Sequence, residues 1–355
     1  MQTTRVRFSQ FWWYMTLTLV SGILIAHGLG IQWLRVLPPK PRFSIFDRNY
    51  VGSYTRGSAD HYLFRFGLFG MGEKIRRGDI LLLGTSHTEL GLSAAQLGSS
   101  LITSYGRPLR VFNLGLERGE GISFFRDILE LNNTRDKILI ADLYNGFGTK
   151  VSDYAQQARQ ADVLGAYIEV IQIWTDFVRD WILDGLLPHL TMVNDPAAPH
   201  ISMTRFLNHT VIRSWKTGDL LEIWTPLDGA IYHGISAKFS CPFVLAQPER
   251  PSQDYSVAFQ GAFPSQFLSK HNIHPVFTLL PFPKYDPRWA SVQASSLGYP
   301  FIAIDPIGLR MLNGDHLNAE GRTLASMHLA QGLLAISNLT SAVKYSESYS
   351  DNPSP

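Results

Sequence analysis

Short aliphatic runs alternate with longer helix-like segments from about residue 79 onward. Five such runs, each bounded by Gly, Pro or Asn, occupy residues 79–84, 109–115, 137–144, 274–282 and 300–306. Continuous apolar runs of this length are typical of strands that are buried on both faces of a parallel sheet. Helical segments lie between most of them, which indicates a doubly wound layer. We therefore expect an α/β fold built on a parallel five-stranded sheet.

The stretch between the third and fourth runs, about residues 150–265, is far longer than an ordinary crossover, so it must carry structure of its own. Within it, the apolar residues of 163–188 recur near helical spacing and the polar ones fall on the other side, which predicts an amphipathic helix. This helix either packs on the core or faces a partner or a membrane. We expect the insertion to be mainly helical. The predicted apolar face of the helix comprises Leu164, Tyr167, Ile171, Trp174, Phe177 and Trp181.

The N-terminal pattern differs from the rest of the chain. Residues 11–34 contain no Asp, Glu, Lys or Arg and have aromatic residues near both ends. Because about 20 apolar residues in a helix cross a bilayer, we expect residues 1–37 to be a membrane anchor; a cleaved signal peptide and a buried core helix are the alternatives. Counted alone, the flanking Lys and Arg residues mildly favour a cytoplasmic body. Residues 38–78 follow as a Pro-rich connector and lead-in, and the Ser-rich residues 341–355 predict a disordered tail.

Composition narrows the functional classes. The 355-residue chain is 45 % hydrophobic, which is ample for a sizeable core, and its formal net charge of +2 argues against a nucleic-acid partner. A single cysteine, Cys241, excludes an internal disulfide framework. The histidines are scattered and no glycine pattern fits a dinucleotide loop, so we expect neither a metal site nor a cofactor.

Polar residues follow the predicted strands, at the edge where ligands bind in open parallel sheets. Ser86 follows the first run, where a serine is either a helix N-cap or a nucleophile. Asn113 and Gly115 end the second run, and a glycine there lets a backbone N–H approach a substrate oxygen or simply allows a turn. Asn145 follows the third run, in an Asn-Gly pair that is equally typical of a turn.

A histidine at the start of the C-terminal helix completes this set. His316 lies in the segment LNGDHLNAEGRTLAS, residues 312–326, and would meet Ser86 if both lie at the carboxyl edge of one sheet. A hydroxyl becomes a good nucleophile when a neighbouring base takes its proton, so His316 is the candidate base. The alternative is that Asp315 or Asn318 caps the helix and His316 has no chemical role.

Three blocks carry a resemblance to a known family. GTSH, NLG and DHLNAEG, in this order on successive predicted strands, resemble the SGNH (GDSL-like) hydrolase superfamily and, within it, membrane-anchored envelope proteins associated with polysaccharide acylation. The resemblance covers roughly residues 79–335 apart from the insertion. It implies a flavodoxin-like three-layer SGNH-hydrolase fold for an α/β domain over residues 79–340.

The resemblance also implies roles for individual residues. Ser86 would be the nucleophile and His316 the general base, and the oxyanion hole would be formed by the backbone N–H groups of Ser86 and Gly115 together with Asn145. The family usually has an acid three residues before the histidine, but this chain has Asn313 there. An Asn can orient an imidazole without stabilising its charged form, and Asp315 is a possible alternative acid.

The resemblance further implies a function and a location. It suggests O-acyl transfer, for example of acetyl, to or from a cell-envelope or secreted polysaccharide, or esterase activity on such a glycan. It places the chain in a bacterial inner membrane as a single-pass protein with a periplasmic body. A multi-span membrane acyltransferase or a polysaccharide synthase complex would be its partner. Because of Asn313, a catalytically degenerate scaffold or glycan-binding subunit of such a complex is the alternative.

Overall fold

The computed structural model describes most of the region between residues 49 and 336. The chain divides into two units by its contacts, and the sheets and the candidate site described below lie in the unit Arg42–Phe177 with Leu207–Pro355. Of the other unit, Met1–Pro41 with Val178–Phe206, the structure describes only the second part of one long helix. The described ranges are 49–54, 57–105, 108–116, 120–143, 151–190, 210–224, 226–227, 230–231, 241–242, 255–281, 286–311 and 316–336.

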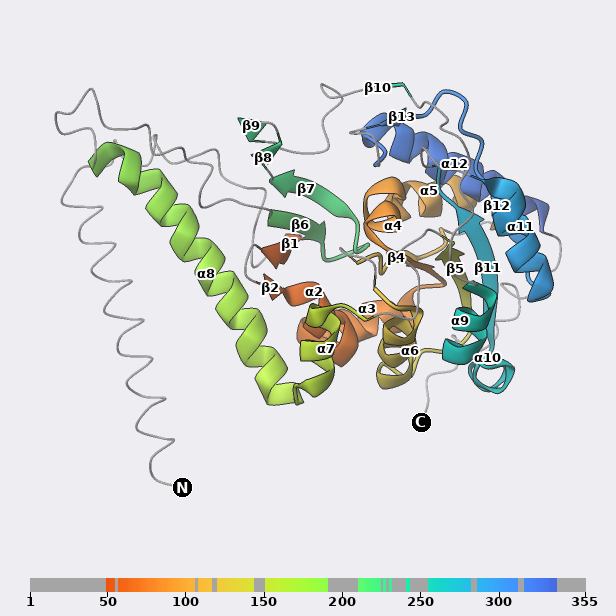
Figure 1. Cartoon of the computed structure of the whole chain (residues 1–355), viewed down its shortest axis with the longest axis horizontal. Coiled ribbons are helices and arrows are strands. Elements are labelled where there is room, and N and C mark those ends of the chain that lie inside the picture. Colours follow the sequence, from red (N-terminus) through yellow and green to blue (C-terminus); the bar gives the residue numbers. More distant parts are fainter. Residues whose placement is uncertain are drawn as a thin grey trace. The chain divides into compact units, whose positions relative to one another are not determined.

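Five parallel strands form the central sheet, in the spatial order β12-β11-β5-β3-β4 (Figure 1). Each strand coincides with one of the five predicted runs, so the prediction of a parallel five-stranded sheet is confirmed. The chain passes from β3 to one neighbour, β4, and then returns to the other side, so the order reverses between β3 and β5. The strands are β3 Ile80–Leu83, β4 Val111–Asn113, β5 Lys137–Asp142, β11 Ile273–Leu279 and β12 Phe301–Ala303.

The described helices are α2 Ala59–Phe66, α3 Met71–Arg77, α4 Ser86–Gly91, α5 Ala94–Tyr105, α6 Ile122–Leu131, α7 Asp153–Gln160, α8 Val163–Leu190, α9 Tyr255–Ala262, α10 Ser265–His271, α11 Pro287–Ser296, α12 Ala319–Ala335 and the short 3-10 helix η2 Leu68–Gly70.

Helices pack on both faces of the parallel sheet. On one face, alternate strand side chains such as Ile80 join residues of α5 and α12 in one apolar cluster. On the other, the ring of Phe112 on β4 meets Phe64 of α2 at 6.0 Å between centroids, and Phe277 on β11 meets Phe259 of α9 at 4.8 Å. Burial on both faces explains why the strands are continuous apolar runs rather than alternating ones.

A second, antiparallel sheet joins two distant parts of the chain. Its order is β2-β1-β6-β7. Strands β1 and β2 lie in the predicted lead-in, whereas β6 and β7 lie in the insertion, so the expectation of a mainly helical insertion omitted this sheet. Its strands are β1 Asn49–Tyr54, β2 Gly57–Ser58, β6 Thr210–Ser214 and β7 Leu220–Trp224. The remaining short strands are β8 Pro226–Leu227, β9 Ala230–Ile231, β10 Cys241–Pro242 and β13 Arg310–Met311.

The predicted amphipathic helix exists as α8, but part of its predicted buried face is exposed. Leu164 and Ile171 are 69 % and 47 % exposed. The buried positions of α8 include Ala166, Val170 and Phe177, which are also spaced at helical intervals. Only Phe177 of these three belongs to the predicted apolar face. Because the helix has apolar residues around most of its surface, tertiary packing rather than periodicity selects the buried side.

Several predictions fall on parts of the chain outside the described residues. These include the membrane anchor over residues 1–37 and the disordered tail over residues 341–355. Within the ranges given above, no helix has both the length and the apolar character that a membrane crossing requires. The predicted span over residues 11–34 therefore stays a prediction.

Candidate functional site

Ser86 begins α4 directly after the central strand β3, next to the point where the strand order reverses. In doubly wound sheets, ligands bind outside the carboxyl ends of the strands at such a point. The helix is capped by Thr85, whose Oγ1 accepts a hydrogen bond from His87 N at 3.3 Å. The side chain of Thr85 therefore fills the capping role that was the alternative reading of Ser86.

His316 lies beside Ser86 although the two residues are far apart in the sequence. The distance from Ser86 Oγ to His316 Nε2 is 3.1 Å, and both side chains are partly buried. Asn318 caps α12, since its Oδ1 accepts a hydrogen bond from Gly321 N at 2.9 Å. His316 precedes this cap and takes no part in it. In the tautomer protonated on Nδ1, Nε2 accepts the Ser86 hydroxyl proton, as a general base must.

A second histidine supports the ring of His316. His87 follows Ser86 in α4, is 6 % exposed, and stacks on His316 with 4.7 Å between ring centroids and 29° between planes. Stacking restricts rotation of the His316 ring and so helps to keep Nε2 directed at Ser86. His87 is not among the residues predicted from the sequence. Its position next to the candidate nucleophile, within the GTSH block, was the available signal.

The NLG segment, residues 113–115, holds α4 in place, and we call it the glycine block. A methyl group added at Gly115 would lie 2.5 Å from Glu89 N, so only glycine lets this segment approach α4 so closely. Asn113 Nδ2 donates to Thr88 O at 3.2 Å and to Leu92 O at 3.0 Å, at the end of α4. The block after β4 is thus packed against the helix that begins with Ser86.

The predicted oxyanion donor at Gly115 is engaged within the protein. Gly115 N–H donates to Asn113 Oδ1 at 2.8 Å, and both residues are buried. This hydrogen bond would have to open before the N–H could reach a substrate oxygen. The oxyanion role of Gly115 therefore stays a prediction. Asn145, Asn313 and Asp315 lie outside the described residues, so their predicted roles also stay predictions.

A buried carboxyl group also contacts α4. Asp142 ends β5 and accepts hydrogen bonds from Thr88 Oγ1 at 3.2 Å and from Leu280 N at 3.1 Å. Burial raises the pKa of Asp142 to about 7, and these two donors only partly offset the effect. Asp142 is not among the residues predicted from the sequence, although an acid at the end of a buried strand is a recognisable signal.

Another serine and histidine meet in the antiparallel part of the fold. His61 Nδ1 lies 2.7 Å from Ser58 Oγ, and His61 Nε2 lies 2.6 Å from Glu120 Oε1. Ser152, which caps α7, also hydrogen-bonds Glu120 through its hydroxyl group. Ser58, His61 and Glu120 are between 0 % and 2 % exposed. We call Ser58, His61 and Glu120 the buried array.

Among the residues that the structure describes, no three His, Cys, Asp or Glu side chains gather in a group that could hold a metal ion. No protein-family model, no curated protein and no solved structure matches this chain.

Proposed function

We propose that this protein carries out acyl-ester chemistry with Ser86 as nucleophile and His316 as general base. The observation that supports the proposal best is the 3.1 Å distance between Ser86 Oγ and His316 Nε2. Two residues from distant blocks meet at the carboxyl edge of a parallel sheet, where doubly wound folds bind their ligands. The strand order is also the one expected of a flavodoxin-like fold, which supports the SGNH resemblance.

The chemistry follows in two steps. His316 Nε2 takes the proton of Ser86 as Oγ attacks the ester carbonyl, and the protonated ring then gives that proton to the departing alkoxide. The acyl group is now an ester of Ser86. An acceptor hydroxyl group, from a sugar or from water, loses its proton to Nε2 as it attacks this ester, and Ser86 regains its proton when it leaves.

The oxyanion formed in each step needs hydrogen-bond donors. The backbone N–H of Ser86 is the predicted first donor. Gly115 N–H becomes a second one if the substrate oxygen replaces Asn113 Oδ1, which now accepts its hydrogen bond. Catalysis by this route therefore includes a local rearrangement of the glycine block on substrate binding.

The substrate class and the location rest on the family resemblance. We propose that the acyl group, such as acetyl, is carried to or from a cell-envelope or secreted polysaccharide. Residues 1–37 would anchor the protein in a bacterial inner membrane, with the α/β domain on the periplasmic side. A multi-span membrane acyltransferase would then supply the acyl group.

Hydrolysis of an aryl acetate by the full-length protein tests the chemistry. Replacing Ser86 by Ala is expected to reduce the rate by about a thousandfold or more, because the nucleophile is lost. A serine-reactive phosphonate should label the wild type on Ser86. Ser99→Ala is the matched control, since Ser99 is an exposed serine that bonds only Gln96 O among the contacts described. Equal rates in the wild type and in Ser86→Ala, with no labelling, would contradict the proposal. Products formed with a sugar acceptor present separate transfer from hydrolysis.

A second candidate function is a non-catalytic scaffold or glycan-binding subunit of a polysaccharide complex. The engagement of Gly115 N–H by Asn113 favours it, because the predicted oxyanion donor is already used within the protein. This candidate predicts glycan binding of equal strength in the wild type and in Ser86→Ala, together with no turnover in either. Titration of both proteins with an acetylated polysaccharide distinguishes the two candidates.

A further inference from the structure

The β6–β7 hairpin comes from the insertion, whose role the sequence leaves open, and it buries two opposite charges. Arg213 near the end of β6 is 0 % exposed, and Asp219 just before β7 is 3 % exposed. Buried charges are costly unless they are paired and hydrogen-bonded. The partners of these two side chains therefore show which segments of the chain the hairpin stabilises.

The turn of the hairpin lies against the end of β4, an edge strand of the parallel sheet. Asn113 N donates to Thr217 O at 2.8 Å, so the turn supplies a partner that the sheet does not provide at this edge. Gly218 has a φ of +66°, and a side chain there would collide with the carbonyl group of Asn113. Only glycine fits this position, which fixes the hairpin tightly on the glycine block.

Arg213 reinforces the same contact. Its Nε donates to Gly218 O at 2.8 Å within the hairpin. Its Nη2 donates to Asn113 O at 2.7 Å and its Nη1 to Gly115 O at 2.7 Å. One planar guanidinium group thus holds both carbonyl groups that flank Leu114, and with them the backbone that carries the predicted oxyanion donor.

The same guanidinium group reaches the helix of the nucleophile. Arg213 Nη1 lies 3.2 Å from Glu89 Oε1 in α4, one turn after Ser86, and 3.2 Å from Asp60 Oδ2 in α2. Burial disfavours the charged form of Arg213, but the facing carboxylates of Asp60 and Glu89 outweigh it and raise the pKa. Arg213 therefore stays charged and links α4, which begins with Ser86, to the glycine block.

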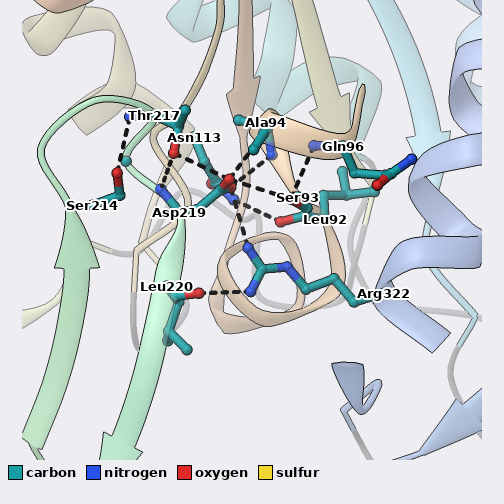
Figure 2. A network of polar contacts seen from close by, with 12 residues as sticks. Leu92, Ser93, Ala94, Gln96, Asn113, Ser214, Thr217, Asp219, Leu220 and Arg322 are labelled. Carbon is teal, nitrogen blue, oxygen red and sulfur yellow. Dashed lines mark hydrogen bonds and ion pairs between the residues drawn. The ribbon is translucent and has the colours of Figure 1, made fainter. Parts of the chain in front are cut away.

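Asp219 caps the helix that follows α4. Its carboxylate accepts hydrogen bonds at the start of α5, and Figure 2 shows these contacts converging on one side chain. Since α4 and α5 are joined by only two residues, fixing the start of α5 also limits movement of α4. The donors are Ala94 N at 2.6 Å, Ala95 N at 2.9 Å and Ser93 Oγ at 3.2 Å.

Asp219 also contacts α12, the helix that begins shortly after His316. Arg322, in the first turn of α12, pairs through Nη2 with Asp219 Oδ1 at 3.2 Å and donates through Nη1 to Leu220 O at 2.6 Å (Figure 2). Arg322 is 9 % exposed and follows His316 closely in the chain. The hairpin thus contacts the segments that carry the nucleophile, the glycine block and the base.

We infer that Arg213 and Asp219 are positioning residues that align Ser86, the glycine block and His316 from outside the sheet. The inference rests on the proposed function and assigns to the β6–β7 hairpin the role of completing the site. Neither residue touches the reacting atoms. Both act through the backbone and side chains that they hold, so their loss changes how well the site is aligned.

The test compares Asp219→Asn and Arg213→Lys with a matched control in the full-length protein. Glu120→Gln is the control, because Glu120 is an equally buried, multiply bonded acid in the buried array. We measure kcat and KM on an aryl acetate, and the rate of phosphonate labelling at Ser86. Misalignment by about 1 Å costs up to about a hundredfold in rate. The two hairpin variants should lose about tenfold or more in kcat and in labelling rate with little change in KM, and the control should lose neither.

Hydrogen–deuterium exchange gives a readout that does not depend on activity. Both hairpin variants should exchange faster than the control in peptides covering α4, residues 113–116 and the start of α12. Unchanged exchange there, or labelling rates equal to that of the wild type, would overturn the positioning role. If the wild type itself is not labelled while the variants exchange faster, the proposed function fails and the structural role of the hairpin stands.

Discussion

Ser86 and Ser58 each lie within hydrogen-bond distance of a histidine, but their surroundings are opposite. Ser86 is partly buried and follows a central strand of the parallel sheet, at the edge where such folds bind ligands. Ser58 is 2 % exposed and precedes α2 at the end of a two-residue edge strand of the antiparallel sheet. The first serine is therefore partly exposed, whereas the second is enclosed.

The enclosed pair is joined by an acid. His61 joins Ser58 on one ring nitrogen and Glu120 on the other, which is the serine, histidine and acid combination of many hydrolases. Its two ring contacts are reversed relative to the serine-protease arrangement, since Nδ1 faces the serine. We therefore predict that access and location in the fold, rather than residue types and short distances alone, decide which of the two pairs reacts.

Replacing each of the two histidines should give the largest difference between the two pairs. His316→Gln should reduce phosphonate labelling of Ser86 by about a thousandfold or more, because the hydroxyl group loses its base. His61→Gln should leave the labelling rate per folded molecule unchanged. Peptide mapping of the labelled wild type should place the adduct on Ser86. An adduct on Ser58, or equal losses in both variants, would reverse the assignment of the two pairs.

The sequence predicted the part of the fold whose signals are local. The five strands were identifiable because burial on both faces leaves continuous apolar runs, and Ser86 and His316 were identifiable because they follow or flank those elements. The helix α8 was also identifiable, but its buried side was not. Leu164 is exposed and Val170 is buried although both are apolar, so the choice depends on what packs against the helix.

The parts that could not be predicted depend on contacts between distant segments. Strand β1 pairs with β6, so the register Tyr50 with Arg213 joins two regions that no local pattern connects. Arg213 and Glu89 are charged residues that a reader of the sequence places on the surface. They are buried because each meets the opposite charge from another segment. The capping role of Thr85, by contrast, is local and follows from ordinary N-cap chemistry.

The buried acid beside the Ser86 site gives a second, smaller effect that depends on pH. Burial raises the pKa of Asp142 from its ordinary value of 3.8 to about 7. Between these values the folded protein holds a proton that the unfolded chain has released, so the free energy of unfolding falls as the pH rises through this window. The difference of about 3 pKa units corresponds to about 4 kcal/mol at most.

Asp142→Asn should remove this pH dependence, because the amide does not titrate. Urea denaturation of the wild type and of the variant between pH 4 and pH 8 measures the effect. The stabilising effect of the protonated carboxyl group is largest at the acid end of this range and is lost as the pH rises towards 7, so the variant should gain relative to the wild type as the pH rises. Parallel stability curves for the two proteins would show that Asp142 is ionised in the folded state at neutral pH.

The two serines should show opposite profiles when each is replaced by Ala, and the difference in stability between these variants is the smallest of the expected effects. Ser58→Ala removes one buried hydrogen bond and leaves His61 Nδ1 without that partner, which should lower the free energy of unfolding by about 1 to 2 kcal/mol. Its aryl acetate activity per folded molecule should equal that of the wild type.

Ser86→Ala should instead lose activity while its stability changes by about 0.5 kcal/mol or less, because Thr85 and not Ser86 caps α4. Chemical denaturation and esterase assays on the same preparations measure both quantities. If Ser86→Ala proves the more destabilised variant and keeps its activity, Ser86 has the structural role here assigned to Ser58.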